Sequence, residues 1–307
     1  MSHREVFKFS PKRCYLIPHE RTCYLDTGVI RRRLKSLDNS PLANSAYTSA
    51  LTIVELVGCC RVSDEDFRVS RMTISALLSA RIPIDWRLPD VQSRCAFPSL
   101  RPKVDIYETR TVSLKTIVKI LCTSEKITEL NQRLANERVD PGIEYFENYD
   151  TKLGTDYLAA MKDERSRSKK VFDPDSLFIK KLGLPPEVTH DEYIRLLQGS
   201  ELNYIMSRGV MIDKICGEEG FNVKEHRPRL WFEYDGSIDP YLRGLGWWHF
   251  DQTLGRTAGR NDGLDLAHLL YLVPNSHLVT SDRSFSACAD KIGVSVIGPN
   301  SPVISGG

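Results

Sequence analysis

The chain has 307 residues, of which 41% are hydrophobic and 27% charged, and its formal net charge at pH 7 is +2. This length accommodates one large domain or two modest ones, and the composition is that of an ordinary soluble globular protein. A net charge this small does not by itself predict nucleic-acid binding, so any such binding depends on local basic patches.

Three further features of the sequence concern membranes and cellular location. No run of about 18 apolar residues is present, which predicts no transmembrane span. The first ten residues are charged and lack the apolar centre of a secretory signal. The eight cysteines contain no Cys-x-x-Cys pair and no zinc spacing, which is typical of reduced thiols, so we expect a cytoplasmic protein.

The first informative stretch is a short apolar segment that ends on an acid. Residues 1–20 alternate weakly and could form an edge hairpin or an arm. Residues 22–25 then read as a buried strand closing at Asp26, and Gly28 permits a tight turn into a helix at about 29–37. That helix carries a dense basic cluster, which is either a solvated face or a rim that contacts phosphates: Arg31, Arg32 and Arg33.

The second stretch, residues 44–60, reads as a helix with an acid inside its apolar face. Leu51 and Val54 belong to that face, and Glu55 lies among them. A lone buried carboxylate is costly, so Glu55 needs a partner. The alternative is a capping box, because Thr52 and Glu55 have the required spacing.

The middle of the chain, residues 61–247, looks largely helical and polar. The proline-rich part at 81–103 predicts an extended connection. These residues form either a helical subdomain that covers the sheet or a lid around a substrate. An aromatic cluster at 231–250 is more typical of a core than of a surface that stacks bases.

Near the C-terminus, acids again stand at the ends of predicted elements. Asp262 and Asp265 lie at the start of an apolar helix, and residues 278–280 read as a strand ending at Ser281 and Asp282. A helix at 285–291 and a strand at 293–297 follow. In open α/β sheets ligands gather at such strand ends. Clustered carboxylates repel unless a cation or proton joins them, and Mg²⁺ or Mn²⁺ prefers oxygen ligands.

The order of these acids resembles that of the PIN-like domain, a family of Mg²⁺- or Mn²⁺-dependent nucleases that act mostly on RNA. That pattern has a strand ending in Asp-Thr, a helical Glu, a helix-borne Asp and a Thr-x-Asp at a strand end. The matching positions are Asp26, Glu55, Asp265 and Asp282. The resemblance covers about residues 20–60 and 250–300, and the long connection between the second and third acids departs from the shorter one of small PIN domains.

The resemblance implies a role for each group. Asp26, Asp265 and Asp282 would bind Mg²⁺ or Mn²⁺, and Glu55 would orient or deprotonate the attacking water. The side chains expected to support these acids from behind are Thr27, Asp262, Thr280 and Ser281. Those expected to hold the nucleic-acid backbone are Arg31, Arg32, Arg33, Arg256 and Arg260.

We therefore expect an α/β fold with a PIN-like three-layer core and a central, mostly parallel sheet of four or five strands. Residues 1–60 and 248–307 would form that core, and residues 61–247 a mainly helical insertion or lid. His268, three residues past Asp265, is interpreted as a packed or hydrogen-bonded helix histidine.

The expected function is that of a divalent-metal-dependent nuclease, with RNA as the substrate favoured by the family and DNA left open. The family's habits also suggest a toxin or antiphage effector, with an inhibitor protein or a homo-oligomer as further partners. One alternative is a non-catalytic PIN-like scaffold that binds RNA or protein. Another is a phosphatase with Asp26 as nucleophile, although Gly28 replaces the second Asp of the haloacid-dehalogenase pattern.

Overall fold

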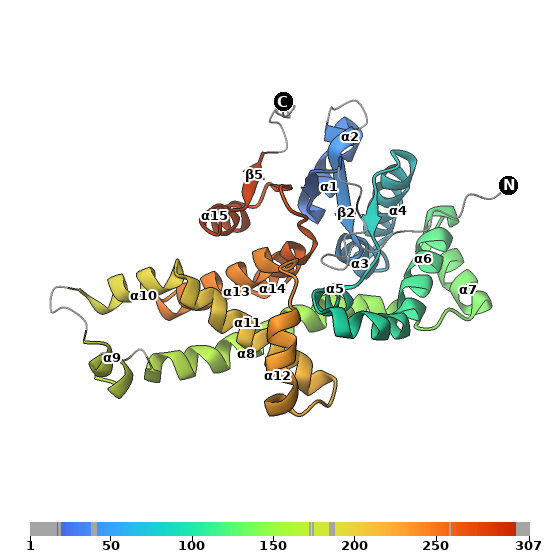
Figure 1. Ribbon diagram of the computed structural model, residues 1–307. Coiled ribbons are helices and arrows are strands. Elements are labelled where there is room, and N and C mark those ends of the chain that lie inside the picture. Colours follow the sequence, from blue (N-terminus) through green and yellow to red (C-terminus); the bar gives the residue numbers. More distant parts are fainter. Residues whose placement is uncertain are drawn as a thin grey trace.

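The fold is taken from a computed structural model of the whole chain (Figure 1). It describes residue 17 and residues 20–37, 42–171, 173, 175–183, 188–257 and 259–298. The N-terminal hairpin or arm expected within residues 1–20 lies almost wholly outside these ranges.

The centre of the fold is a five-stranded parallel sheet with the order β3-β2-β1-β4-β5. Its strands are β1 (Cys23–Leu25), β2 (Ala46–Ser49), β3 (Ile84–Asp85), β4 (His277–Val279) and β5 (Ser295–Ile297). The chain moves from β1 outward to β3 on one side and from β4 outward to β5 on the other. The direction therefore reverses between β1 and β4, and at such a switch point the carboxyl ends of the strands leave a crevice.

Alternation along the strands divides the interior into two cores, one on each face of the sheet. Cys23 and Leu25 belong to one buried cluster, whereas Tyr24 between them belongs to the other. The same alternation separates Val279 from Leu278 in β4. Because successive strand side chains point to opposite faces, helices must cover both sides. The expected α/β fold with a parallel sheet between two helical layers is confirmed.

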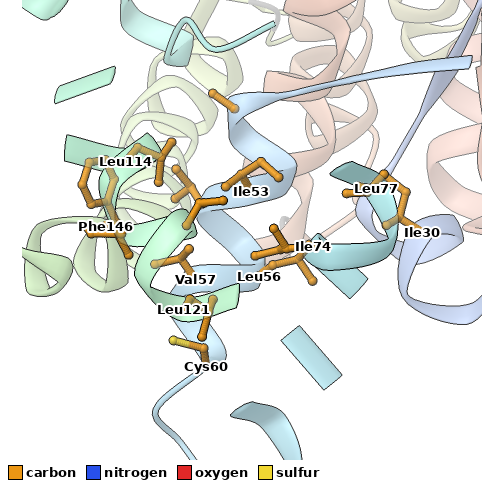
Figure 2. Packing of buried hydrophobic residues seen from close by; sticks show 14 of the residues in the cluster. Ile30, Ile53, Leu56, Val57, Cys60, Ile74, Leu77, Leu114, Leu121 and Phe146 are labelled. Carbon is orange, nitrogen blue, oxygen red and sulfur yellow. The ribbon is translucent and has the colours of Figure 1, made fainter. Parts of the chain in front are cut away.

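The first face is covered by helices that follow β1, β2 and β3. They are α1 (Thr27–Leu37), α3 (Ala50–Cys59), α4 (Asp64–Ser79), α6 (Glu108–Thr123) and α7 (Ile127–Glu137). Figure 2 shows how Ile53 and Val57 of α3 pack between side chains of the neighbouring helices, such as Ile74 and Leu121. The apolar residues of α3 are buried on almost every side, which makes Glu55 the exception in that helix.

The second face is covered by helices from the C-terminal half. They are α11 (Glu201–Glu218), α13 (Asp239–Thr253), α14 (Arg260–His268), the 3₁₀-helix η2 (Leu269–Tyr271) and α15 (Arg283–Lys291). The aromatic segment is mostly core as expected, because Trp248 and Phe250 are almost fully buried. Phe232 is the exception, with 88% of its surface exposed.

The long helix α8 (Ile143–Val171) contacts both helical layers, because it packs against α3 of the first face and α14 of the second (Figure 1). The remaining helices are α2 (Leu42–Ser45), α5 (Pro89–Cys95), the 3₁₀-helix η1 (Pro98–Tyr107), α9 (Leu177–Leu182), α10 (His190–Gln198) and α12 (Val223–Glu233). Among the described helices none combines the length and the apolar character needed to cross a bilayer.

Two strands lie where the sequence predicted other structures. Ala46–Ser49 forms β2 at the start of the stretch expected to be helical. Ile84–Asp85 forms β3 inside the proline-rich connection, which also contains α5 and η1. Both strands are too short for a clear period of two, and β2 is buried on both faces. The sheet therefore extends into the range 61–247 that was assigned to the insertion.

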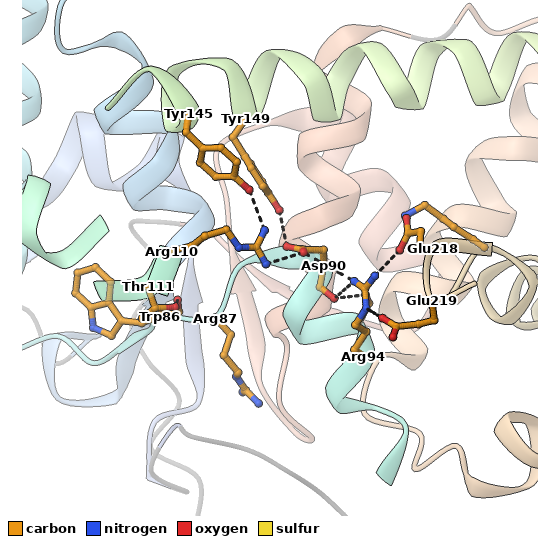
Figure 3. Close-up of polar contacts among 12 residues, drawn as sticks. Trp86, Arg87, Asp90, Arg94, Arg110, Thr111, Tyr145, Tyr149, Glu218 and Glu219 are labelled. Carbon is orange, nitrogen blue, oxygen red and sulfur yellow. Dashed lines mark hydrogen bonds and ion pairs between the residues drawn. The ribbon is translucent and has the colours of Figure 1, made fainter. Parts of the chain in front are cut away.

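A partly buried polar network around Asp90 of α5 joins helices of the two faces (Figure 3). One oxygen of Asp90 accepts a hydrogen bond from Arg110 at 2.9 Å, and the other accepts one from the Tyr149 hydroxyl at 3.0 Å. One helical turn later, Arg94 pairs with Glu218 and Glu219 at the end of α11, both at 2.8 Å. The short helix α5 thus connects α6, α8 and α11.

We expect Asp90→Ala to destabilise the fold by roughly 2 kcal/mol, because the partly buried Arg110 and Tyr149 would each lose a charge-assisted hydrogen bond. The side chain of Asp90 is 27% exposed, so water offsets part of the loss. Urea unfolding of Asp90→Ala and of Glu65→Ala checks this, since Glu65 is an exposed partner of Arg68 and its removal should leave the midpoint unchanged. Equal midpoints for both variants would contradict the role of the network.

Candidate active site

The candidate site lies at the switch point of the sheet, where β1 and β4 end side by side. The backbone N–H of Asp26 donates to the Val279 carbonyl at 3.3 Å and ties the two strand ends together. A Cβ atom added to Gly28 would lie 3.6 Å from Asp26 Oδ1 and 3.8 Å from Ser281 Oγ. Gly28 therefore lines the same small space as Asp26 and Ser281.

Asp26 is 6% exposed, and its Oδ1 accepts the Val29 N–H at 2.7 Å in the first turn of α1. Burial raises the pKa of Asp26 above its ordinary value, and the charge of Glu55 raises it further. The Thr280 hydroxyl, the Val29 N–H and His268 act in the opposite direction. The Val29 N–H thus fixes the position of the Asp26 carboxyl, although burial makes its ionised form less favourable than in water.

Asp265 lies in α14, and within the described residues its side chain makes no hydrogen bond or ion pair. Burial is the largest of the effects that raise the pKa of Asp265 to about 8. The charges of Asp282, Glu55 and Asp26 also raise it, whereas His268 lowers it. The other three acids singled out by the sequence therefore all act on Asp265 across this end of the sheet.

Glu55 lies in the middle of α3 and is not a helix cap. The helix begins at Ala50 after Ser49, and the Thr52 hydroxyl accepts a hydrogen bond from Thr48 at 2.9 Å. The capping-box alternative is therefore wrong. The partner of Glu55 is His268, whose Nε2 lies 2.8 Å from Glu55 Oε1.

His268 is a packed and hydrogen-bonded helix histidine, as expected from the sequence, but it also contacts an acid of the site. It is 3% exposed, and its second ring nitrogen, Nδ1, lies 2.5 Å from the Tyr24 hydroxyl. Burial lowers the pKa of His268, but the charge and hydrogen bond of Glu55, with the charges of Asp26 and Asp265, raise it above 6.5 overall. Its spacing from Asp265 placed it near the site, but nothing in the sequence identified Glu55 as its partner.

Asp282 lies at the exposed rim as the N-cap of α15, and its Oδ1 accepts the Phe285 N–H at 2.8 Å. The Thr280 hydroxyl accepts the Asp282 N–H at 3.0 Å, so it contacts the last acid as well as the first. The Thr27 hydroxyl is buried and has no hydrogen-bond partner among the described residues. It is available to a water molecule or a ligand beside Asp26.

Asp262, expected to assist the metal-binding acids, is engaged elsewhere. Its Oδ2 accepts the Gly259 N–H at 2.9 Å, which starts α14, and its Oδ1 accepts from Arg256 at 2.9 Å. Arg256 also lies over the ring of Trp248 at 5.2 Å. Both residues therefore stabilise the beginning of α14.

The arginines predicted to hold the nucleic-acid backbone do not all lie at the site. Arg32 donates to Ser281 Oγ at 3.4 Å and so reaches the mouth of the site. Arg31 donates to Cys59 Sγ at 3.0 Å at the far end of α3. The side chains of the two remaining candidates, Arg33 and Arg260, are outside the described part of the structure.

Among the described residues, Asp26 and Asp265 differ from the paired carboxylates of Asp85 and Asp235 in having no lysine or arginine partner. Asp85, at the end of β3, forms a buried ion pair with Arg87, and Asp235 pairs with Arg101 at 2.6 Å. Asp26 and Asp265 have no ion pair with a lysine or arginine in the part of the chain that the structure describes. Buried carboxylates of that kind are costly, and they are typical of sites that receive a cation.

The donor set suits a hard divalent cation in its chemistry, because carboxylate oxygens are the preferred ligands of Mg²⁺ and Mn²⁺. Asp282 uses one oxygen on a backbone N–H, Asp26 accepts from the Val29 N–H and the Thr280 hydroxyl, and Asp265 uses neither oxygen with a described residue. No three acidic, histidine or cysteine side chains among the described residues are arranged to hold an ion as they stand.

Comparison of the chain with protein families, curated proteins and solved structures finds no match.

Proposed function

We propose that this chain is a divalent-metal-dependent nuclease that hydrolyses phosphodiester bonds, and that its substrate is RNA. One observation carries the proposal: Asp265 is partly buried with no described partner, and its pKa rises to about 8 because burial and three other carboxylates act on it. A cation bound among these acids would remove that repulsion and favour the ionised form. The resemblance to the PIN-like domain supports the same chemistry and favours RNA over DNA.

Each acid has a distinct part in this proposal. Asp26, Asp265 and Asp282 would hold Mg²⁺ or Mn²⁺ between the ends of β1 and β4 and the second half of α14. The ion, when bound, would polarise the phosphoryl oxygen and stabilise the leaving oxygen. Glu55, one of whose oxygens is taken by His268, would use the other to orient the attacking water and accept its proton.

The deciding experiment is cleavage of labelled single-stranded RNA and single-stranded DNA in Mn²⁺, in Mg²⁺ and in EDTA. We expect cleavage of RNA that needs either metal and stops in EDTA. Preferential cleavage of DNA would change the substrate but keep the chemistry. Binding of RNA without cleavage in any metal would favour the non-catalytic scaffold, and a covalent aspartyl-phosphate without cleavage would favour the phosphatase.

Arg32 and Arg31 provide a matched pair for testing how the substrate is held. Arg32→Ala should raise KM for RNA about fivefold, and its loss should flatten the plot of log affinity against log salt by about 0.7, the value for one contact to a single strand. Arg31→Ala removes the same charge from a neighbouring position whose side chain points to Cys59, and should leave both quantities unchanged. Equal effects of the two substitutions would contradict a specific contact at Arg32.

A further inference from the structure

A chain of hydrogen bonds links the core of the protein to Glu55. Ser49 Oγ lies 2.8 Å from the Tyr24 hydroxyl, which contacts His268 Nδ1, and His268 Nε2 contacts Glu55 Oε1. The chain joins β2, β1, α14 and α3, four elements that meet at the site. Residues far apart in the sequence therefore fix the position of a single carboxylate.

The direction of the last bond does not depend on the charge of the imidazole. The ionised carboxylate of Glu55 can only accept, so a neutral His268 carries its hydrogen on Nε2 and its Nδ1 accepts from Tyr24. If His268 is an imidazolium, both nitrogens carry hydrogens and Tyr24 donates to Ser49 instead. In both cases Nε2–H donates to Glu55, which leaves Oε2 of Glu55 as the oxygen that can act on a water molecule.

The chain of hydrogen bonds ends inside the protein at Ser49, and this limits the functions that it can have. Tyr24 and Ser49 are fully buried, and burial raises the pKa of Tyr24 well above its ordinary value, so the hydroxyl keeps its proton. Packing also holds the tyrosine, because its ring stacks on Tyr271 with centroids 6.3 Å apart and lies 5.3 Å from Tyr47. These contacts do not connect the chain of hydrogen bonds to solvent. It is therefore suited to holding the Glu55 carboxylate in place rather than to transferring protons.

We propose that His268 is a positioning residue for Glu55: braced by Tyr24 at Nδ1, it holds the Glu55 carboxylate through Nε2–H so that one oxygen faces the reacting water. This inference rests on the proposed nuclease function. In this role His268 contacts neither the substrate nor the metal and affects the reaction only through Glu55. Losses of about 10- to 100-fold are usual when such a supporting hydrogen bond is removed.

Two substitutions of His268 separate its two contacts. Glutamine places its side-chain nitrogen near the position of Nε2, so His268→Gln can still donate to Glu55. Asparagine reaches only the position of Nδ1, so His268→Asn keeps the Tyr24 side and loses Glu55. With the RNA cleaved by the parent and saturating Mn²⁺, we expect His268→Asn to lower kcat about 30-fold with KM unchanged, and His268→Gln to stay within about fivefold of the parent.

Tyr24→Phe provides a second variant in case His268→Asn does not fold. It keeps the packed ring and removes only the hydroxyl that braces Nδ1, so kcat should fall about three- to tenfold at unchanged KM. His268→Asn should also add little to Glu55→Gln, because both remove the same function.

The outcomes distinguish the two proposals. A parent without metal-dependent cleavage overturns the nuclease function and this inference with it. A parent that cleaves, while His268→Asn and Tyr24→Phe keep the full kcat, overturns the inference alone. Equal losses in His268→Gln and His268→Asn, in step with a lower unfolding temperature, would likewise overturn it in favour of a purely structural histidine.

Discussion

Asp26→Asn is expected to lower metal-dependent RNA cleavage by about 10³-fold, which corresponds to about 4 kcal/mol of transition-state stabilisation. The substitution removes the negative charge that would bind the ion. It keeps the structural contact, because the amide oxygen of asparagine can accept the Val29 N–H that Asp26 Oδ1 accepts at 2.7 Å. The loss should therefore appear in kcat without a loss of folding.

Single-turnover cleavage at saturating Mn²⁺, with an unfolding curve for each protein, checks this expectation. Asp290→Asn is the control, because it makes the same change of charge at an exposed position in the last turn of α15. It should cleave as fast as the parent. If Asp26→Asn cleaves within threefold of the parent, Asp26 does not take part in the reaction, and the end of β1 contributes no acid to it.

Much of the core could be predicted from local pattern, because the strands that carry the acids end where their apolar runs end. Asp26 and Thr280 follow β1 and β4 directly, and parallel strands place their carboxyl ends at one edge. The helical period also placed Asp265 on a helix, although α14 begins at Arg260 and Asp265 lies in its second half rather than at its start as predicted. Four acids in chain order could therefore be identified before their positions in space were known.

The partners of those acids depend on tertiary packing and could not be predicted in this way. His268 and Glu55 are 213 residues apart in the chain, and no local pattern indicates that they are in contact. Asp262 and Asp265 look equivalent in the sequence, yet only Asp262 is neutralised by Arg256. The two short strands β2 and β3 were missed for a related reason, since pairing with neighbours stabilises them more than their own composition does.

The difference between Asp262 and Asp265 gives a second large expected effect, this time on stability. In EDTA at pH 8, Asp265→Asn should be more stable than the parent by on the order of 2 kcal/mol, and Asp262→Asn should be less stable. Asp265 has no described partner to lose, whereas Asp262→Asn would take from Arg256 the nearer of its two acidic partners, at 2.9 Å, and leave only Asp251 at 3.8 Å.

The sign for Asp265 follows from its two pKa values. Its pKa is about 8 in the folded protein against an ordinary 3.8. The folded state therefore binds more protons, and the parent loses stability as the pH rises from about 4 to about 8. Each pKa unit corresponds to about 1.4 kcal/mol in full, which screening at this partly exposed side chain reduces. The advantage of Asp265→Asn should be almost gone near pH 4, where the carboxyl is protonated in the folded state and about half protonated in the unfolded state.

In Mn²⁺ the relative stability of the parent and Asp265→Asn should reverse, so that the parent becomes the more stable of the two. An ion that binds the folded parent at 100 times its Kd adds about 2.7 kcal/mol, whereas the asparagine variant binds it more weakly and gains less. Urea unfolding of the parent, Asp265→Asn and Asp262→Asn at pH 4 and pH 8, with EDTA or Mn²⁺, tests both halves. A pH-independent difference in EDTA would show that Asp265 carries no buried-charge cost. Equal stabilisation by Mn²⁺ in the parent and in Asp265→Asn would show that it is not a ligand. If both halves hold, the carboxylate that destabilises the empty protein is the one that binds the ion.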